Sequence, residues 1–238
     1  MNRLAGQGVV ITGATRGIGR AIAGRLAEAG MRVGVLGRDG EALEQLARAL
    51  APAVQATAVC DLADLDSIPA AVHRLGADLG DIHALVNNAG VFLERPLAEI
   101  GTAEWERALR INLGAPFVLC RELIPRLIAS GGGGGGRIVN IASTAGSQGY
   151  LNQSAYCASK HGLLGLSRAL AIEMKPHGIH VSCVSPGGVH TDFIKGTLLG
   201  ERLRGQTMIQ PEDVAETVRH VLELPGHVDV PEVVMRRF

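Results

Sequence analysis

A glycine-rich turn directly after an apolar run is the feature that most limits how this chain can fold. The run at 9–11 is followed by Thr-Gly-Ala-Thr-Arg-Gly-Ile-Gly, whose glycines are Gly13, Gly17 and Gly19. Gly13 can turn the chain sharply, Gly17 lets the backbone approach a pyrophosphate, and Gly19 lets a helix pack closely on a strand. The N-terminus of that helix offers free N–H groups to an anion. The segment therefore predicts a strand, a phosphate-binding turn and a helix, although an ordinary strand-to-helix turn can also carry such glycines.

Apolar runs alternate with amphipathic segments along the rest of the chain, which is typical of parallel strands joined by helices. We expect one α/β domain over 1–238, a doubly wound parallel sheet of about seven strands with helices on both faces. The expected strands are 8–12, 32–36, 54–60, 84–87, 137–142, 180–185 and 228–234.

The expected helices include 21–29, 41–50 and 102–129. A further helix is expected from about 152 to 175, because Ala, Leu, Lys and Glu dominate after Ser154. Pro211 and the acidic residues after it indicate another helix start. The six consecutive glycines at 131–136 favour a flexible loop in solvent.

A tyrosine and a lysine stand four residues apart, at Tyr156 and Lys160, and Ser143 lies thirteen positions before the tyrosine. On a helix such a pair shares one face. A neighbouring ammonium favours the phenolate, and a tyrosine with the ordinary pKa of about 10 needs such help to exchange protons at neutral pH. The pair is thus a candidate acid–base site.

The chain resembles the short-chain dehydrogenase/reductase family in its compact form. The resemblance rests on the glycine spacing together with Asn87-Asn88-Ala89-Gly90, Ser143, Tyr156 and Lys160. The resemblance extends from about Gly8 to Val221. It implies a Rossmann-like fold and an NAD(P)-dependent enzyme acting on CH–OH and C=O groups.

Specific roles follow from that resemblance. Tyr156 would exchange the proton, Ser143 would bond the substrate oxygen, and Lys160 would lower the tyrosine pKa and hold the nicotinamide ribose. Asn112 matches the fourth member, which positions a water beside the lysine, although an asparagine within a helix is otherwise usually solvated. The implied cofactor contacts are Gly13, Thr15, Arg16, Gly17, Ile18, Gly19, Arg38, Asp61, Leu62, Asn88, Ala89, Gly90, Tyr156, Lys160, Pro186, Gly187, Val189 and Thr191.

The choice of cofactor follows from charge. Arg38 stands nineteen positions after Gly19, where dinucleotide folds read the ribose, and a guanidinium suits a 2′-phosphate. Arg16 can add a second positive contact. The sequence therefore predicts NADP over NAD, with NAD still possible because Asp39 follows Arg38; Asp39 can alternatively cap the next helix. Asp61 leaves two roles open in the same way, a contact with adenine or a helix cap before Leu65.

The composition indicates a cytoplasmic protein with no nucleic acid, membrane or metal partner. Basic and acidic residues balance at 23 each, so no net field attracts nucleic acid or anionic lipid. The four cysteines form no Cys-x-x-Cys pair, which favours reduced, packed thiols, and the eight histidines lack metal-ligand spacing.

The substrate is the least determined part. Pocket walls are expected from 144–153 and from a lid at about 191–210, with Tyr150 and Phe193 as substrate contacts and Leu151, Ile194, Leu198 and Leu199 as further apolar lining. This lining suits a ketone, an aldehyde or an acyl chain. Alternatives are a 3-oxoacyl-(acyl-carrier-protein) reductase, which the C-terminal sequence disfavours, a non-catalytic dinucleotide sensor, and an isomerase or dehydratase of the sugar-nucleotide type. The family implies a homo-oligomer, a tetramer or dimer, formed through the helices at 102–129 and 152–175.

Overall fold

Seven short runs rich in Val, Ile and Ala form one parallel sheet in the computed structural model, which describes residues 3–130 and 135–238. The strand order is β3-β2-β1-β4-β5-β6-β7. The order reverses at β1, which pairs with β2 on one side and β4 on the other, so the sheet is doubly wound. The strands are β1 Gly8–Thr12, β2 Arg32–Gly37, β3 Val54–Val59, β4 Ala84–Asn87, β5 Arg137–Ile141, β6 His180–Pro186 and β7 Glu232–Met235.

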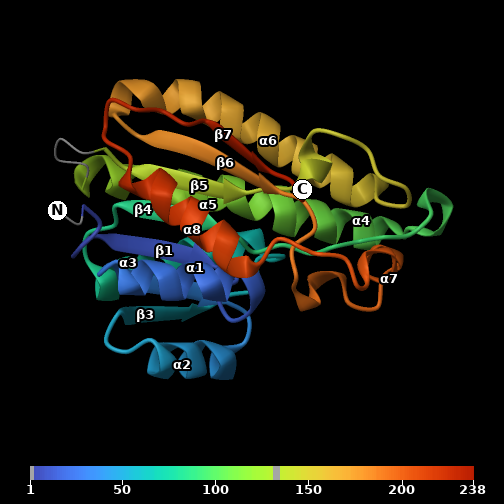
Figure 1. Ribbon diagram of the computed structural model, residues 1–238. Helices are drawn as coiled ribbons and strands as arrows, with labels where there is room; N and C mark the ends of the chain where they lie inside the picture. The colour runs from blue at the N-terminus through green and yellow to red at the C-terminus, as the bar shows by residue number, and fades with distance from the viewer. Residues whose placement is uncertain (1–2, 131–134) are drawn as a thin grey trace.

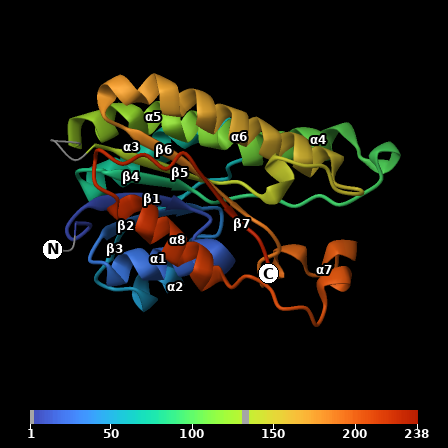
Figure 2. The same ribbon diagram turned by 45° about the horizontal axis from the view of Figure 1, so that its top comes forward.

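Helices cover both faces of the sheet (Figures 1 and 2). On one face α1, α2 and α8 cover the sheet through a core that includes Leu26, Leu43 and Val218. On the other face α3, α5 and α6 pack through Leu75, Leu123 and Leu170. The helices are α1 Gly17–Glu28, α2 Gly40–Ala49, α3 Ile68–Leu79, α4 Thr102–Leu109, α5 Ala115–Ser130, α6 Ser154–Met174, α7 Leu198–Leu203 and α8 Pro211–Glu223.

The expected α/β fold is confirmed, and six of the strands begin at the expected residue. The last strand is shorter than expected, Glu232–Met235 in place of 228–234. Val228 donates to the carbonyl of Pro225 in a turn, and Pro231 has no N–H for a ladder bond. The first helix begins at Gly17, ahead of the expected residue 21, directly in the glycine turn.

The segment expected as one helix at 102–129 is helical throughout, but it is not one uninterrupted α-helix. A π-helical turn, Arg110–Gly114, separates α4 from α5. Such wide turns insert one extra residue into a helix and are frequent at functional sites. Asn112 lies inside this turn with its side chain fully buried. A glycine loop is expected at 131–136, and its residues 131–134 lie outside the described part of the chain.

Two glycines of the first turn are required by packing. Gly13 has φ +65°, and a Cβ there would lie 2.9 Å from the Cα of Ala89. A Cβ on Gly19 would overlap the carbonyl oxygen of Gly13 and the side-chain amide of Asn88. Side chains at these positions would push the turn after β1 away from the loop after β4.

We therefore expect Gly19→Ala to destabilise the fold by about 1–3 kcal/mol, the usual cost of overpacking a tight contact. Urea unfolding followed by circular dichroism measures the change.

Gly24→Ala is the matched control, because Gly24 lies in the same helix with open space where its Cβ would be. It should stabilise the protein by about 0.5–1 kcal/mol, since alanine is the better helix former. Equal effects of the two substitutions would contradict the packing role of Gly19.

Candidate active site

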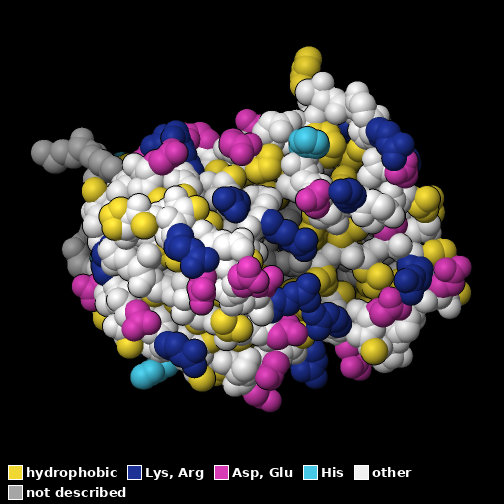
Figure 3. All heavy atoms as spheres, turned by 90° about the horizontal axis from the view of Figure 1, so that it is seen from below, with side chains coloured by type: hydrophobic (Ala, Val, Ile, Leu, Met, Phe, Trp, Pro, Cys, Tyr) yellow, Lys and Arg dark blue, Asp and Glu magenta, His cyan; other side chains and the backbone are white. Residues whose placement is uncertain are grey.

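A cavity of about 760 Å³ opens at the carboxyl ends of the strands. The turn after β1 and the segments that follow β2 to β6 all contribute to its wall. It spans the reversal point between β1 and β4, where open parallel sheets bind their ligands. Lys and Arg side chains gather beside a hollow on the face seen from below (Figure 3).

Nearly all the residues singled out in the sequence border this one cavity. They include every implied cofactor contact together with Ser143, Tyr150 and Phe193, and also the expected pocket residues Ile194 and Leu199. Three residues do not border it. Asn112 is buried behind the wall, and Leu151 and Leu198 are 71% and 59% exposed, so their expected place in the lining is wrong.

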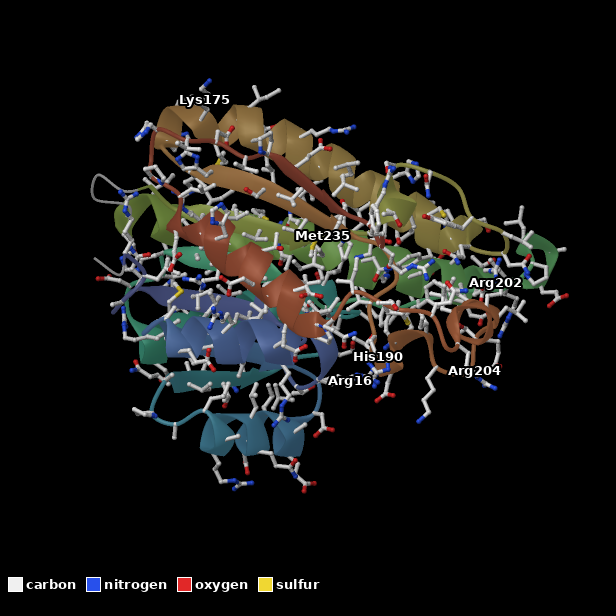
Figure 4. All side chains as sticks on the ribbon, viewed as in Figure 1. Arg16, Lys175, His190, Arg202, Arg204 and Met235 are labelled. Atoms are coloured by element: carbon white, nitrogen blue, oxygen red, sulfur yellow. The ribbon has the colours of Figure 1, made fainter. Side chains whose placement is uncertain are left out.

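The glycine turn presents a helix N-terminus that suits an anion. No side chain caps α1 at Arg16, and its first turn has no acidic residue, so its leading N–H groups face no negative charge of their own. Thr191, after β6, lies beside this turn, since a Cβ on Gly17 would lie 3.3 Å from its methyl group. Figure 4 labels Arg16 and His190 at this junction. The arrangement fits a pyrophosphate between the two segments.

Two arginines border the cavity at its phosphate end, Arg16 in the turn after β1 and Arg38 directly after β2. Arg16 and Arg38 are exposed, border the cavity and have no ion-pair partner within the described part of the chain. The carboxylate of Asp39 accepts a hydrogen bond of 3.0 Å from the backbone of Ala42 and caps α2. The capping role considered for Asp39 is thus confirmed, and two guanidinium groups remain available for a phosphate.

Asp61 does not take the helix-capping position considered for it. The short helix at Leu65–Ser67 has Asp64 at its N-cap, while Asp61 accepts from the backbone of Ala63 in a local turn. Its other oxygen lies 3.7 Å from the guanidinium of Arg107, and both side chains border the cavity. An adenine contact by Asp61 stays a prediction.

Tyr156 is buried at the first turn of α6, 7% exposed. Burial raises its pKa to about 12, and a hydrogen bond with Ser143 opposes that rise. The ammonium of Lys160 does not lower the pKa of Tyr156 as expected: Nζ lies 5.9 Å from the ring centroid, and burial dominates. Tyr156 therefore carries its proton at neutral pH.

Lys160 lies one turn further along α6 and is 4% exposed. Its Nζ donates to the carbonyl of Ile141, at the end of β5, over 2.8 Å. Burial lowers the pKa of Lys160 to about 8. The shared helix face of the tyrosine and lysine is confirmed, and β5 fixes the position of the lysine.

Asn112 connects three elements of the site. Its Oδ1 accepts from the backbone of Val91 at 2.8 Å, and its Nδ2 donates to the carbonyl of Val91 and to the hydroxyl of Ser159. The solvated alternative for this residue is wrong. A Cβ on Gly90 would meet Oδ1 of Asn112 at 3.2 Å and Nζ of Lys160 at 3.8 Å, so both polar atoms face the space beside Gly90.

An aromatic cluster surrounds the Tyr156 ring. Phe92, after β4, meets it edge-on with ring centroids 4.9 Å apart, and Phe193 lies 6.3 Å away. Tyr150 is held by a hydrogen bond of 2.9 Å between its hydroxyl and that of Thr144. The apolar surface expected near the reacting group is present at this end of the cavity.

A short helix covers this end of the cavity. The lid expected at about 191–210 contains a 3-10 turn, Asp192–Ile194, and α7. Glu94, whose side chain is 1% exposed, accepts from the backbone of Leu199 at 2.9 Å and pairs with Arg202 at 3.2 Å. Arg202 is labelled in Figure 4. The buried carboxylate thus fastens the lid to the loop after β4.

Sequence reasoning missed several cavity residues. Phe92 directly follows the Asn-Asn-Ala-Gly-Val segment and could have been found by its aromatic character. No motif marked Arg107, Arg236 or Arg237, which reach the cavity only because α4 and the end of β7 lie beside it. Gln148 and Gln153 also border the cavity and lie within the wall expected at 144–153.

The described residues contain no group of three or more His, Cys, Asp or Glu side chains placed to hold a metal ion. None of the described helices has both the length and the apolar character required to cross a membrane. All four cysteines are buried with free thiols.

Comparison with known proteins shows which family has this sequence and fold. A family model described as short chain dehydrogenase matches residues 7–201. D-threitol dehydrogenase of Mycolicibacterium smegmatis is 38% identical over 193 residues, which is 80% of this chain and 73% of that protein. The 3-oxoacyl-[acyl-carrier-protein] reductase FabG of Aquifex aeolicus is 34% identical, covering 91% of this chain and 90% of its own. A metagenomic short-chain oxidoreductase solved with NADP superposes with a TM-score of 0.84 at 36% identity, over 99% of this chain and 98% of that one.

The lowered pKa of Lys160 predicts a pH dependence of stability. The pKa is about 8 in the folded chain and 10.5 when unperturbed, so between these values the unfolded chain binds the extra proton and stability rises with pH. The free energy of unfolding of the protein relative to that of Lys160→Met should increase by about 2 kcal/mol from pH 8 to pH 10. Urea titrations at both pH values measure it.

Lys175→Met is the control, because Lys175 is exposed at the far end of α6 (Figure 4). It should leave the pH dependence of the protein unchanged. A Lys160→Met variant with the same pH dependence as the protein would show that Lys160 titrates normally.

Proposed function

The chain belongs to the short-chain dehydrogenase/reductase family of oxidoreductases, and we propose that it transfers a hydride between NADP(H) and a carbonyl or secondary-alcohol substrate. The observation that carries the proposal is the joint placement of Ser143, Tyr156 and Lys160 on the wall of the cavity that also receives the glycine turn. A dinucleotide lying across this cavity would bring its nicotinamide end to these three side chains.

The cavity supplies suitable groups along the length of such a cofactor. The glycine turn and the free N–H groups of α1 would receive the pyrophosphate. Arg16 and Arg38 would bind a 2′-phosphate, which favours NADP over NAD, and the NADP-bound relative supports this choice. Asp61 and Leu62 would border the adenine. At the other end, Pro186, Gly187, Val189 and Thr191 would contact the nicotinamide.

The chemistry of the chain's own residues follows from their environments. A bound NADPH would supply the hydride. Tyr156 holds its proton firmly at neutral pH and would donate it to the carbonyl oxygen as negative charge develops there. Ser143 would bond the same oxygen and stabilise that charge. In the oxidative direction Tyr156 would accept the proton of the alcohol, while Lys160 would bond the hydroxyls of the nicotinamide ribose.

Asn112 would act behind these groups. Its bonds to Val91 and Ser159 fix the loop after β4 against α6, one turn from Tyr156. Because its Oδ1 and the Nζ of Lys160 face the same space beside Gly90, a water there could link the lysine to solvent. This supports the proton-relay role proposed for Asn112.

Sequence similarity favours a second candidate function, the reduction of a 3-oxoacyl group on acyl-carrier protein. A reductase named for 3-oxoacyl-[acyl-carrier-protein] covers 91% of this chain at 34% identity. The same three polar residues would reduce a thioester-linked ketone without change of mechanism. A non-catalytic sensor would have no use for them.

We also propose a homo-oligomer, in which α5 and α6 meet copies of themselves. Phe117 on α5 and Ile172 on α6 are 50% and 77% exposed, as expected of apolar side chains in such an interface. Light scattering of the purified protein measures the mass directly.

Tyr156→Phe tests the proposed proton donor. Turnover of a ketone should fall by about 10²–10⁴-fold, because the phenol is the only proton source proposed at the carbonyl oxygen. NADPH binding, followed by fluorescence titration, should change little. The absorbance of NADPH during the reaction gives the rate.

Tyr150→Phe is the matched control, since it removes the only other phenol in the chain, one bonded to Thr144. Its effect should be under about tenfold. Comparable turnover in Tyr156→Phe and the unaltered protein would refute the role of Tyr156.

Arg38→Ala tests the cofactor choice. Loss of one charge-assisted bond to a phosphate should lower kcat/KM for NADPH by about 10–100-fold and leave that for NADH nearly unchanged. Arg48→Ala serves as control, because Arg48 is exposed on α2 and faces Glu44. An unchanged NADPH-to-NADH ratio in Arg38→Ala would contradict the assignment.

A further inference from the structure

One buried amide nitrogen on the cavity wall has no hydrogen-bond partner among the described residues. The side chain of Gln153 is 2% exposed, and its Nε2 has no hydrogen-bond partner among the described residues. Gln153 borders the cavity together with Ser143 and Tyr156 and precedes Tyr156 by three residues. Buried polar groups are almost always hydrogen-bonded, so an unpaired donor at a cavity wall points to a partner from outside the chain.

The side chain has no structural task that would explain its position. Gln153 is the N-cap residue of α6, yet its side chain makes no capping bond. Its backbone serves the fold instead: the N–H donates to the carbonyl of Tyr150, and the carbonyl accepts from Cys157 at 2.7 Å. Replacing the side chain would remove none of these bonds.

The other buried atom without a partner is different in kind. It is Oδ1 of Asn87, whose own Nδ2 donates to Asn140 at 2.8 Å between two central strands. Asn87 does not border the cavity. A carbonyl oxygen left with free lone pairs is also more common in proteins than an unpaired N–H. Among the described residues, only Gln153 combines a buried, unpaired side-chain donor with a place on the cavity wall.

We propose that Gln153 determines specificity by donating a hydrogen bond to a second oxygen of the substrate, beside the carbonyl that Tyr156 protonates. The substrate class is then a carbonyl compound with a neighbouring oxygen acceptor, a hydroxyl or a carboxylate. This inference rests on the proposed function and narrows the ketones and aldehydes that the apolar lining alone would admit.

The expected specificity comes from the free-energy cost of leaving a buried hydrogen-bond donor without an acceptor. A site that bonds a substrate hydroxyl or carboxylate leaves its own group unpaired when an apolar analogue binds, and therefore rejects that analogue strongly. The aromatic rings of Phe92 and Phe193 shield the reacting carbonyl but offer no such bond. Gln153 adds a buried, unpaired donor beside these apolar rings.

The test compares matched substrates in which an oxygen group is replaced by carbon. Hydroxyacetone is paired with butanone, and acetoacetate with 4-methyl-2-pentanone; the two pairs separate the hydroxyl from the carboxylate. Values of kcat and KM with NADPH are measured for the unaltered protein and for Gln153→Leu. Gln55→Leu is the matched control, because Gln55 is exposed on β3.

We expect Gln153→Leu to lower kcat/KM about 10–100-fold for the oxygenated member of one pair, mainly through KM, and to change its carbon analogue less than about threefold. Gln55→Leu should change neither. Equal losses on both members of each pair would indicate a structural role and overturn the proposal, as would no loss at all.

Gln153→Glu sharpens the result, since a carboxylate cannot donate and repels an anion. It should lose acetoacetate turnover at least as strongly as Gln153→Leu. Retained acetoacetate turnover in this variant would contradict donation by Gln153.

A binding measurement keeps the inference separate from the proposed activity. In 15N-labelled protein with NADP⁺, the side-chain amide signal of Gln153 is identified by its loss in Gln153→Leu. It should shift on addition of acetoacetate or hydroxyacetone and stay in place with their carbon analogues. Absence of turnover on every carbonyl would defeat the proposed function alone, whereas an unmoved amide signal would defeat the role of Gln153.

Discussion

The contact between the end of β1 and the loop after β4 is the constraint on which the rest of the structure depends. The hydroxyl of Thr12 accepts from the N–H groups of Asn88 and Ala89, both at 3.0 Å, and the Asn88 amide donates back to the carbonyls of Thr12 and Gly13. Only glycine fits at the positions that touch this contact. Because it joins the two strands at the reversal point of the sheet, it sets the cavity in which the candidate site lies.

A second set of buried hydrogen bonds fixes the candidate catalytic side chains Tyr156 and Lys160. Asn112 ties the loop after β4 to Ser159, whose hydroxyl donates to the carbonyl of Tyr156 at 2.7 Å. Lys160 is fixed to the end of β5. The same burial that makes these bonds necessary raises the pKa of Tyr156 and lowers that of Lys160. Burial thus accounts both for the fixed positions of Tyr156 and Lys160 and for their shifted pKa values.

Apolar runs and motif spacing predicted the sheet, its direction and most of the cavity wall, because strands at 8–12 or 84–87 are local patterns and parallel strands bring their carboxyl ends together. The π-helical turn at Asn112, the rise in the Tyr156 pKa and the unpaired amide of Gln153 could not be predicted. Each depends on what surrounds a side chain after folding. Exposure of Leu151 and Leu198 likewise depends on how the lid turns, which apolar character alone does not determine.

The most direct test of the account is the oxidation of NADPH by the purified protein, followed by absorbance with a panel of ketones, aldehydes and β-ketoacyl thioesters, with NADH in parallel. The account predicts turnover of at least one carbonyl substrate and a preference for NADPH, since Arg16 and Arg38 border the cavity and pair with no carboxylate of the described residues. Tight NADPH binding without turnover on any substrate would contradict the proposed catalysis and favour a dinucleotide sensor.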